Sequence, residues 1–339
     1  MRFHMTQLTT YFPELDPPPE VYVQQLLEQI ALAEELGWEC FWFTEHHFIP
    51  YGGLVPNPAV MLAAAAARTS RIHLGSAISI LPLRHPLQTA EDYAMVDVVS
   101  GGRLEFGIGR GNTADDYLAY GVAPAESRAR FEEAAEVILR AWTNSRFSHA
   151  GTFWRFEDVT LYPRPVQRPH PPIWVAATSR DTAAWAGRRG YHIMTVAHPF
   201  PPEQVRSAVA AWRAALHEAG YDPATRHNKI HIRVWVDENA ERARAMAEAA
   251  IARYEAVARA RRRLEGPLPA AEAYDWEGML AAGRNIYGTP EQCIAGIHRA
   301  VRNYDFDILG TQFNYGGLPH EAVMRAMRLF AREVMPAFQ

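Results

Sequence analysis

The stretch that decides the fold is Phe41-Trp42-Phe43-Thr44-Glu45-His46-His47-Phe48, where an aromatic run changes abruptly to an acid and two histidines. Strands buried on both faces of a parallel sheet read as continuous apolar runs. In parallel α/β enzymes, the polar side chains that carry the chemistry follow the carboxyl ends of such strands. The segment is therefore typical of a buried strand that ends at an active site.

Apolar, β-rich runs alternate with helical patterns on both sides of this stretch. We expect strands near 3–10, 40–45, 72–80, 104–109, 173–177, 191–196, 230–236 and 306–312. We expect helices near 19–36, 58–69, 87–99, 125–142, 180–189, 202–218, 239–262, 290–303 and 319–334. Eight strands that alternate with helices predict an α/β fold, a TIM (β/α)8 barrel. A doubly wound sheet is the alternative, but no linker-like stretch divides the chain, so we expect one domain over residues 1–339.

Two regions interrupt the alternation and are predicted to be insertions. Residues 143–172 contain several aromatic residues and five prolines, which predicts a hairpin with extended chain. Residues 261–287 begin with Arg261-Arg262-Arg263 and predict a long excursion of the kind that often forms a lid. We interpret the arginine run as a solvated helix end that complements the helix dipole. Beyond it, Thr289-Pro290-Glu291-Gln292 predicts a capping box at the start of a helix.

Composition limits the classes of function. The chain has 339 residues, 48% of them hydrophobic, and can bury a sizeable core. A net charge of −4 disfavours nucleic acid and anionic lipid as partners, so we expect a small molecule. The longest apolar stretch, Ala59 to Ala67, is too short to span a bilayer, and no signal-type segment opens the chain. Cys40 and Cys293 are the only cysteines, which favours a cytoplasmic protein without disulfides.

Lys229 is the only lysine, and this excludes further chemistry. A Walker phosphate loop contains a lysine within a glycine-rich motif, and Lys229 does not lie in such a motif. A Schiff-base mechanism would depend on this single side chain.

The two adjacent histidines invite a metal interpretation, which we consider weak. Adjacent strand residues point to opposite faces, so His46 and His47 could bind one ion only if the strand had already ended. No His-x-His, Cys-x-x-Cys or His-Glu-x-x-His pattern supports a metal site, and none is expected. A general acid/base or hydrogen-bonding role for one histidine suits the location better, with the other packed behind it. The alternative is that both satisfy buried polar groups.

Two further segments lie at predicted strand-to-helix junctions. Gly107-Ile108-Gly109-Arg110-Gly111-Asn112 half resembles a dinucleotide fingerprint, but its third glycine falls one place early. We interpret it as a cradle for a phosphate or a ring. Thr178-Ser179-Arg180-Asp181-Thr182 opens a helix, so Ser179 is either an N-cap or part of an anion site. A barrel would gather both junctions on one face.

Taken together, these motifs resemble the bacterial luciferase-like flavin monooxygenases, over essentially Met1 to Pro336. The motifs that carry the resemblance are Thr44-Glu45-His46-His47-Phe48, Asn57-Pro58, Leu81-Pro82-Leu83-Arg84-His85-Pro86, Ser100 to Gly111 and Gly288-Thr289-Pro290-Glu291. The resemblance implies a TIM barrel with insertions, a homodimer, and reduced FMN supplied by a separate flavin reductase. It also implies that O2 is activated as a flavin C4a-hydroperoxide.

The resemblance also implies roles for individual residues. His46 matches the catalytic histidine, and Ala77-Ile78 matches a cis peptide beneath the flavin. Four residues match positions that hold the FMN phosphate: Arg110, Arg128, Ser179 and Thr182. The expected cofactor-binding set is completed by Glu45, Gly109, Asn112, Ala176 and Thr178.

Departures from the luciferase pattern restrict what the resemblance implies. Gly109 stands where luciferase α subunits carry a reactive cysteine, and Thr178 replaces an acidic residue. The resemblance therefore does not by itself imply light emission or a long-chain aldehyde substrate. We expect a monooxygenase that oxygenates a small apolar or carbonyl-bearing molecule. Two alternatives stay open: a deazaflavin (F420)-dependent hydride-transfer enzyme and a non-catalytic flavin-binding protein.

Overall fold

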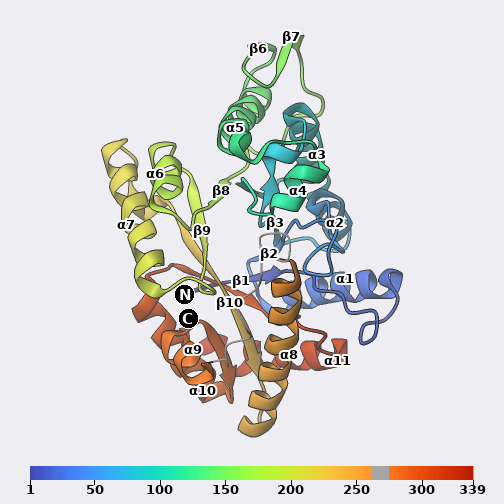
Figure 1. Ribbon diagram of the computed structural model, residues 1–339, viewed down its shortest axis with the longest axis vertical. Helices are drawn as coiled ribbons and strands as arrows, with labels where there is room; N and C mark the ends of the chain where they lie inside the picture. The colour runs from blue at the N-terminus through green and yellow to red at the C-terminus, as the bar shows by residue number, and fades with distance from the viewer. Residues whose placement is uncertain (262–274, 339) are drawn as a thin grey trace.

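The computed structural model describes residues 1–261 and 275–338 (Figure 1). The strands are β1 Arg2–Gln7, β2 Cys40–Phe43, β3 His73–Ser76, β4 Ser79–Ile80, β5 Leu104–Gly109, β6 Phe147–Ala150, β7 Arg155–Val159, β8 Ile173–Ala176, β9 His192–Val196, β10 Asn228–Val236, β11 Asn285–Gly288 and β12 Ile308–Gln312. The α-helices are α1 Pro19–Leu36, α2 Pro58–Ala66, α3 Pro86–Ser100, α4 Ala114–Ala119, α5 Ser127–Thr143, α6 Arg180–Arg188, α7 Pro202–Glu218, α8 Ala240–Arg261, α9 Trp276–Ala282, α10 Pro290–Tyr304 and α11 His320–Glu333. Short 3-10 helices are η1 Leu81–Leu83, η2 Pro124–Glu126, η3 Pro223–Thr225 and η5 Met335–Phe338.

Eight parallel strands close into a barrel. Hydrogen-bonded neighbours follow the order β1, β2, β3, β5, β8, β9, β10 and β12. Pairing of β12 with β1 completes the ring. Helices surround the strands (Figure 1). The predicted TIM barrel is therefore confirmed.

Alternation along β2 separates two layers of core. Phe41 and Phe43 belong to the large cluster between the strands and the surrounding helices. Trp42 belongs to a separate cluster inside the barrel, together with Cys40, Trp174, Met194 and Ile308. The tryptophan ring fills the interior only because Gly75 faces it: a Cβ at Gly75 would lie 2.2 Å from the Trp42 ring.

The structure differs from the sequence expectation at two strands. The strand predicted over 72–80 is interrupted at Ala77 and Ile78, where the peptide bond is cis, and continues as β4. The prediction also missed β11, which pairs only with the carboxyl half of β10. With four residues directly followed by a helix, β11 is too short to give an alternating pattern.

The predicted insertions are described to different extents. Residues 143–172 contain the expected hairpin, in which β6 and β7 pair antiparallel at the edge of the molecule near α5 (Figure 1). Most of the excursion predicted over 261–287 falls at 262–274, outside the described residues. Its described part contains α9 and the start of β11. That the chain forms one domain stays a prediction.

Local signals at helix ends explain several boundaries. At α10, the Thr289 side chain accepts from the Gln292 backbone N–H, and the Gln292 side chain accepts from the Thr289 backbone N–H, so the predicted capping box is confirmed.

The first strand and the last 3-10 helix lie side by side, since the Met1 ammonium donates to the Phe338 carbonyl oxygen at 2.6 Å.

Candidate active site

The residues predicted to form the site follow the carboxyl ends of adjacent strands. His46 follows β2, the Ala77-Ile78 bond follows β3, Arg110 follows β5 and Thr178 follows β8. These four strands are consecutive neighbours in the barrel. Because the strands are parallel, the four segments share one end of the barrel, the end that carries the active site in TIM-barrel enzymes.

His46 is held between the backbone of the following turn and an aromatic ring. Its imidazole lies against Gly52, where an added Cβ would lie 2.4 Å from His46 Cδ2. Gly52 also has a φ of +82°, which favours glycine independently. The ring meets Tyr51 edge-on, with centroids 5.2 Å apart. The histidine is partly buried, so its ring combines fixed packing with access from the catalytic end.

Glu45 is the centre of a buried polar cluster. Its Oε1 lies 3.1 Å from His47 Nε2 and accepts from Arg84 Nε at 3.3 Å, and its Oε2 accepts from the backbone N–H of Ile80 at 3.3 Å. His47 Nδ1 in turn lies 3.2 Å from the Tyr120 hydroxyl. Glu45 thus ties β2 to the segment that follows the cis peptide bond. Its direct contact with a flavin stays a prediction.

The Ala77-Ile78 peptide bond is cis, as the resemblance implied. Both residues pack with Ala176 against the tryptophan cluster inside the barrel. Gly109 faces the same place: a Cβ there would lie 2.3 Å from Ile78 Cδ1. Small side chains at 77, 109 and 176 leave an apolar surface on which a flat ring could lie.

Three of the four predicted phosphate-binding residues come together. Arg128, at the start of α5, donates from Nη1 to Thr182 Oγ1 at 3.4 Å, and Ser179 Oγ lies 3.1 Å from the same hydroxyl. Ser179 is also the N-cap of α6, accepting from the Thr182 backbone N–H. The cluster therefore combines two hydroxyls and a helix N-terminus with one guanidinium, which also pairs with Glu132 through Nε. The remaining donors are suited to an anion.

Arg110 and Asn112 are placed less tightly. Both are exposed on the loop after β5. The loop itself is held by the Tyr117 hydroxyl, which donates to the carbonyl oxygens of Arg110 and Gly111 at 2.5 and 3.3 Å. The Arg110 guanidinium makes no hydrogen bond or ion pair with residues 1–261 or 275–338, which leaves it available for a ligand.

The sequence analysis missed a second polar network at the same end of the barrel. Glu255 of α8 accepts from Arg233 Nη1 at 2.9 Å and lies 3.0 Å from His198 Nε2. Burial raises the pKa of the Glu255 carboxyl, but the hydrogen bond of His198 and the charge of Arg233 outweigh burial and lower the pKa to about 2. Tyr254 lies under the Arg233 guanidinium and donates to the Tyr51 hydroxyl at 2.8 Å, which connects this network to His46.

Other features of the described residues bear on the class of site. Within the described ranges, no group of three or more His, Cys, Asp or Glu side chains is arranged to hold a metal ion. Cys40 and Cys293 are both buried free thiols. Among the described helices, none is long and apolar enough to cross a membrane.

Several known proteins are similar to this chain in sequence or in fold. Protein y4wF of Sinorhizobium fredii, described as uncharacterized, is 35% identical over 206 residues, which cover 60% of this chain and 59% of that protein. The oxygenase component of the flavin-dependent trigonelline monooxygenase of Acinetobacter baylyi is 30% identical over 196 residues, which cover 57% and 54%. The chain thus spans less than two thirds of the length of these relatives. The crystal structure of monooxygenase RslO1 from Streptomyces bottropensis is 32% identical, covers 100% of both chains and has a TM-score of 0.93.

More distant structures share the fold alone. The oxygenating constituent of 3,6-diketocamphane monooxygenase of Pseudomonas putida, solved with FMN, is 17% identical, with a TM-score of 0.79 and coverage of 100% and 99%. An F420-dependent secondary alcohol dehydrogenase is 19% identical, with a TM-score of 0.75 and the same coverage.

The family profile described as luciferase-like monooxygenase matches residues 1–305 of this chain. Because the match covers most of the sequence, the protein belongs to the luciferase-like monooxygenase family.

Proposed function

We propose that the protein is a monooxygenase that uses reduced FMN and O2 to oxygenate a small apolar or carbonyl-bearing molecule. The observation that carries the proposal is the joint placement of the Arg128, Ser179 and Thr182 cluster with the apolar surface at Ala77-Ile78. One end of such a site suits a phosphate, and the other suits a flat aromatic ring. Reduced FMN, when bound, would supply the oxygen-activating chemistry.

The residues present fit FMN in their chemistry. Thr182 and Ser179 offer hydroxyls, while Arg128 and Arg110 offer cationic donors for the phosphate. Gly109 has no side chain, and a Cβ there would collide with Ile78, so the surface beside the cis bond stays flat. Thr178 directly precedes Ser179, and Asn112 lies two residues after Arg110. We propose that they and Ala176 contact the flavin between its phosphate and its ring.

His46 is proposed as the catalytic residue. Its ring is fixed by Gly52 and Tyr51 and lies beside the carboxyl end of β2. A positioned imidazole can hold or transfer a proton at a ring nitrogen during oxygenation. Glu45 and His47 position the same loop through their own hydrogen bond and through Arg84.

An apolar substrate is supported by the side chains beside this loop. Phe48 is 68% exposed and Leu118 is 70% exposed, and the ring of Tyr120 lies 5.7 Å from that of Phe48. Burying these side chains against a substrate would remove apolar surface from water, which favours binding.

A separate reductase and a homodimer complete the proposal. The trigonelline relative is described as an oxygenase component, which supports delivery of reduced flavin by another protein. Val60 of α2 and Met95, Val98 and Val99 of α3 are exposed apolar side chains on neighbouring helices. We propose that these two helices form the interface between two copies. A cytoplasmic location stays a prediction.

The test combines the purified protein with FMN, NADH, a flavin reductase and candidate substrates, and follows oxygen uptake together with oxygenated product. Product that matches the oxygen consumed supports the proposal. Turnover with reduced F420 and no oxygen uptake would show a hydride-transfer enzyme instead. FMN binding without turnover of any substrate would indicate a flavin-binding protein.

A further inference from the structure

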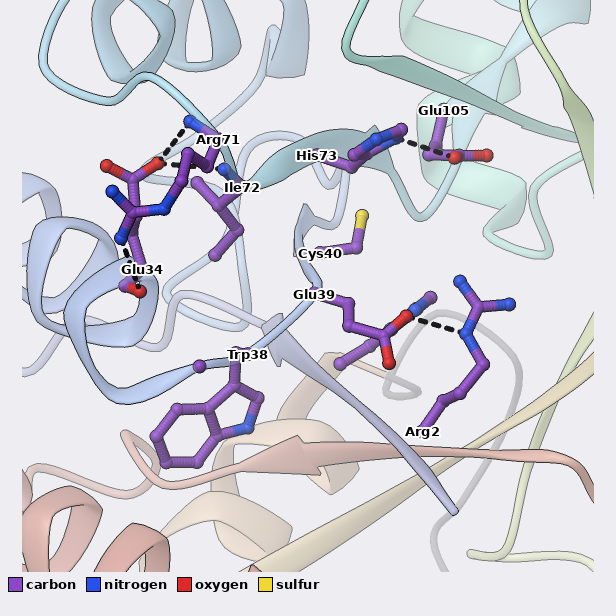
Figure 2. A pocket seen from close by; sticks show the side chains of 11 residues that line it. Arg2, Glu34, Trp38, Glu39, Cys40, Arg71, Ile72, His73 and Glu105 are labelled. Atoms are coloured by element: carbon purple, nitrogen blue, oxygen red, sulfur yellow. Dashed lines mark hydrogen bonds and ion pairs between the residues drawn. The ribbon is translucent and has the colours of Figure 1, made fainter. Parts of the chain in front are cut away.

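A second cavity lies at the opposite end of the barrel from the candidate active site (Figure 2). Its volume is about 330 Å³. Arg2, Cys40 and His73 are the first residues of β1, β2 and β3, and all three line it. Because parallel strands begin at the same end, this cavity opens at the amino-terminal mouth of the barrel and is separate from the flavin site.

Exposed ion pairs line the outer rim of the cavity, and buried side chains line its inner end. At the outer rim, Arg2 Nε donates to Glu39 at 2.6 Å, and the two side chains are 42% and 45% exposed. His73 Nδ1 lies 2.9 Å from Glu105, which also accepts from Trp174 Nε1 at 2.6 Å. At the inner end, Cys40 is 1% and His4 is 2% exposed.

His4 presents an unused hydrogen-bond donor at the inner end. The Trp42 indole N–H donates to His4 Nδ1 at 3.1 Å, so Nδ1 carries no proton. Burial, and then the charge of Lys229, lower the pKa of His4 well below its usual value, which keeps the ring neutral. The ring proton therefore lies on Nε2, which is buried and has no hydrogen-bond partner in the described part of the chain. Leaving such a group unsatisfied destabilises the folded protein.

The hydrogen bonds around the cavity leave no protein acceptor for this donor. Three carboxylates, Glu34, Glu39 and Glu105, line the cavity, and each already has donors. Arg2 contacts Glu39 through Nε, which leaves the outward fork of its guanidinium for another acceptor. Arg2 and His4 are two residues apart on β1, so both side chains face the barrel interior, about 7 Å apart along the strand.

We propose that the amino-terminal mouth of the barrel binds a small carboxylate, which accepts from His4 Nε2–H and is balanced in charge by Arg2. The body of the ligand occupies the cavity that Arg2, Cys40 and His73 line, and Figure 2 shows these three side chains on its wall. The proposal does not depend on flavin chemistry at the other end of the barrel.

The test is a titration of the full-length protein with sodium acetate at constant ionic strength, followed by NMR of the tryptophan indole N–H signals. Acetate should shift one indole signal saturably, because Trp42 donates to His4. Acetamide, which has a similar shape but no charge, should shift it much less. Arg2→Gln should weaken acetate binding roughly tenfold, the loss expected for a charge-assisted contact.

Controls separate this site from other anion sites. Arg68→Gln alters an exposed arginine that bonds Gln24 outside the cavity and should leave acetate binding unchanged. Arg110→Ala, at the flavin end, should also leave it unchanged. The proposal is wrong if no indole signal responds saturably, if acetamide matches acetate, or if Arg2→Gln binds acetate as the original protein does. The first result would mean that water alone satisfies His4, and the other two would mean that the charge of Arg2 does not select a carboxylate.

Discussion

The buried side chain of Lys229 provides a quantitative test of the barrel interior. Its ammonium donates to Thr6 Oγ1 at 2.8 Å and lies 4.4 Å from the centroid of the Trp42 ring. The side chain is 1% exposed, and burial lowers the pKa of this lysine from 10.5 to about 7. At ~1.4 kcal/mol per pH unit, that difference corresponds to about 5 kcal/mol of unfavourable free energy when the folded protein must carry the charge.

The sign of the pH dependence follows from the two pKa values. Between about pH 7 and 10.5 the unfolded chain keeps a proton on Lys229 that the folded protein has released. The free energy of unfolding should therefore rise with pH in this window, by up to ~1.4 kcal/mol per pH unit from this group. Below about pH 7 both states are charged, and the full penalty applies.

Lys229→Met tests this reasoning, because methionine has a similar length and no charge. The variant loses the bond to Thr6 and the contact with Trp42, but it also loses the penalty of burying the charge. We expect the free energy of unfolding at pH 7 to increase by about 2 to 3 kcal/mol. Between pH 7 and 9, the free energy of unfolding of the variant should increase with pH less steeply than that of the original protein, by about 1 kcal/mol per pH unit. Denaturant unfolding at several pH values measures both effects.

A direct measurement complements the unfolding data. Because the chain has one lysine, protein made with 13C-lysine gives a single lysine set of NMR signals. A midpoint near pH 7 supports the argument. A midpoint near the ordinary value of 10.5, or equal pH slopes in the two proteins, would refute the claim that Lys229 is buried at a cost.

Three further predictions concern the proposed function. Arg110→Ala should weaken FMN binding at least about tenfold, as measured by fluorescence titration. The control Arg155→Ala, on the exposed strand β7, should leave FMN binding unchanged. An unchanged dissociation constant for Arg110→Ala would show that Arg110 does not hold the phosphate. His46→Ala should lower substrate oxygenation by ~10²- to 10⁴-fold and release hydrogen peroxide instead of product, with FMN binding nearly intact; normal turnover would make His46 structural. Val60→Asp should yield a monomer in sedimentation velocity, while Val21→Asp on α1 should not, and a monomeric original protein would refute the interface.

Much of the fold follows from local patterns that sequence alone displays. The aromatic run at Phe41 to Phe43 predicts a strand because both of its faces are covered, and the polar residues after it predict the catalytic end of the barrel. The capping box at Thr289 is equally local. Such signals need no knowledge of which residues meet in space. By contrast, β11 has only four residues, and its pairing depends on the unusual length of β10.

The parts of the site that sequence did not reveal depend on contacts between distant residues. Arg233 and Glu255 are 22 positions apart, and only the packing of α8 on the barrel makes them a pair with His198. An arginine within the apolar run from Ile230 to Val236 was the available signal, because an inward-facing charge in a buried strand needs a partner. The conformation of the Ala77-Ile78 bond came from family resemblance and not from any property of the two side chains.

Because the single lysine is buried in the barrel, cleavage at this residue can be used to measure how often the barrel opens. A protease specific for lysine has one site, at the second residue of β10, and the surrounding barrel leaves that lysine only 1% exposed. Fraying of a helix or loop exposes no cleavable bond, so only disruption of the barrel allows a cut. Digestion should therefore yield two fragments, 1–229 and 230–339, at a rate that follows the population of the opened barrel.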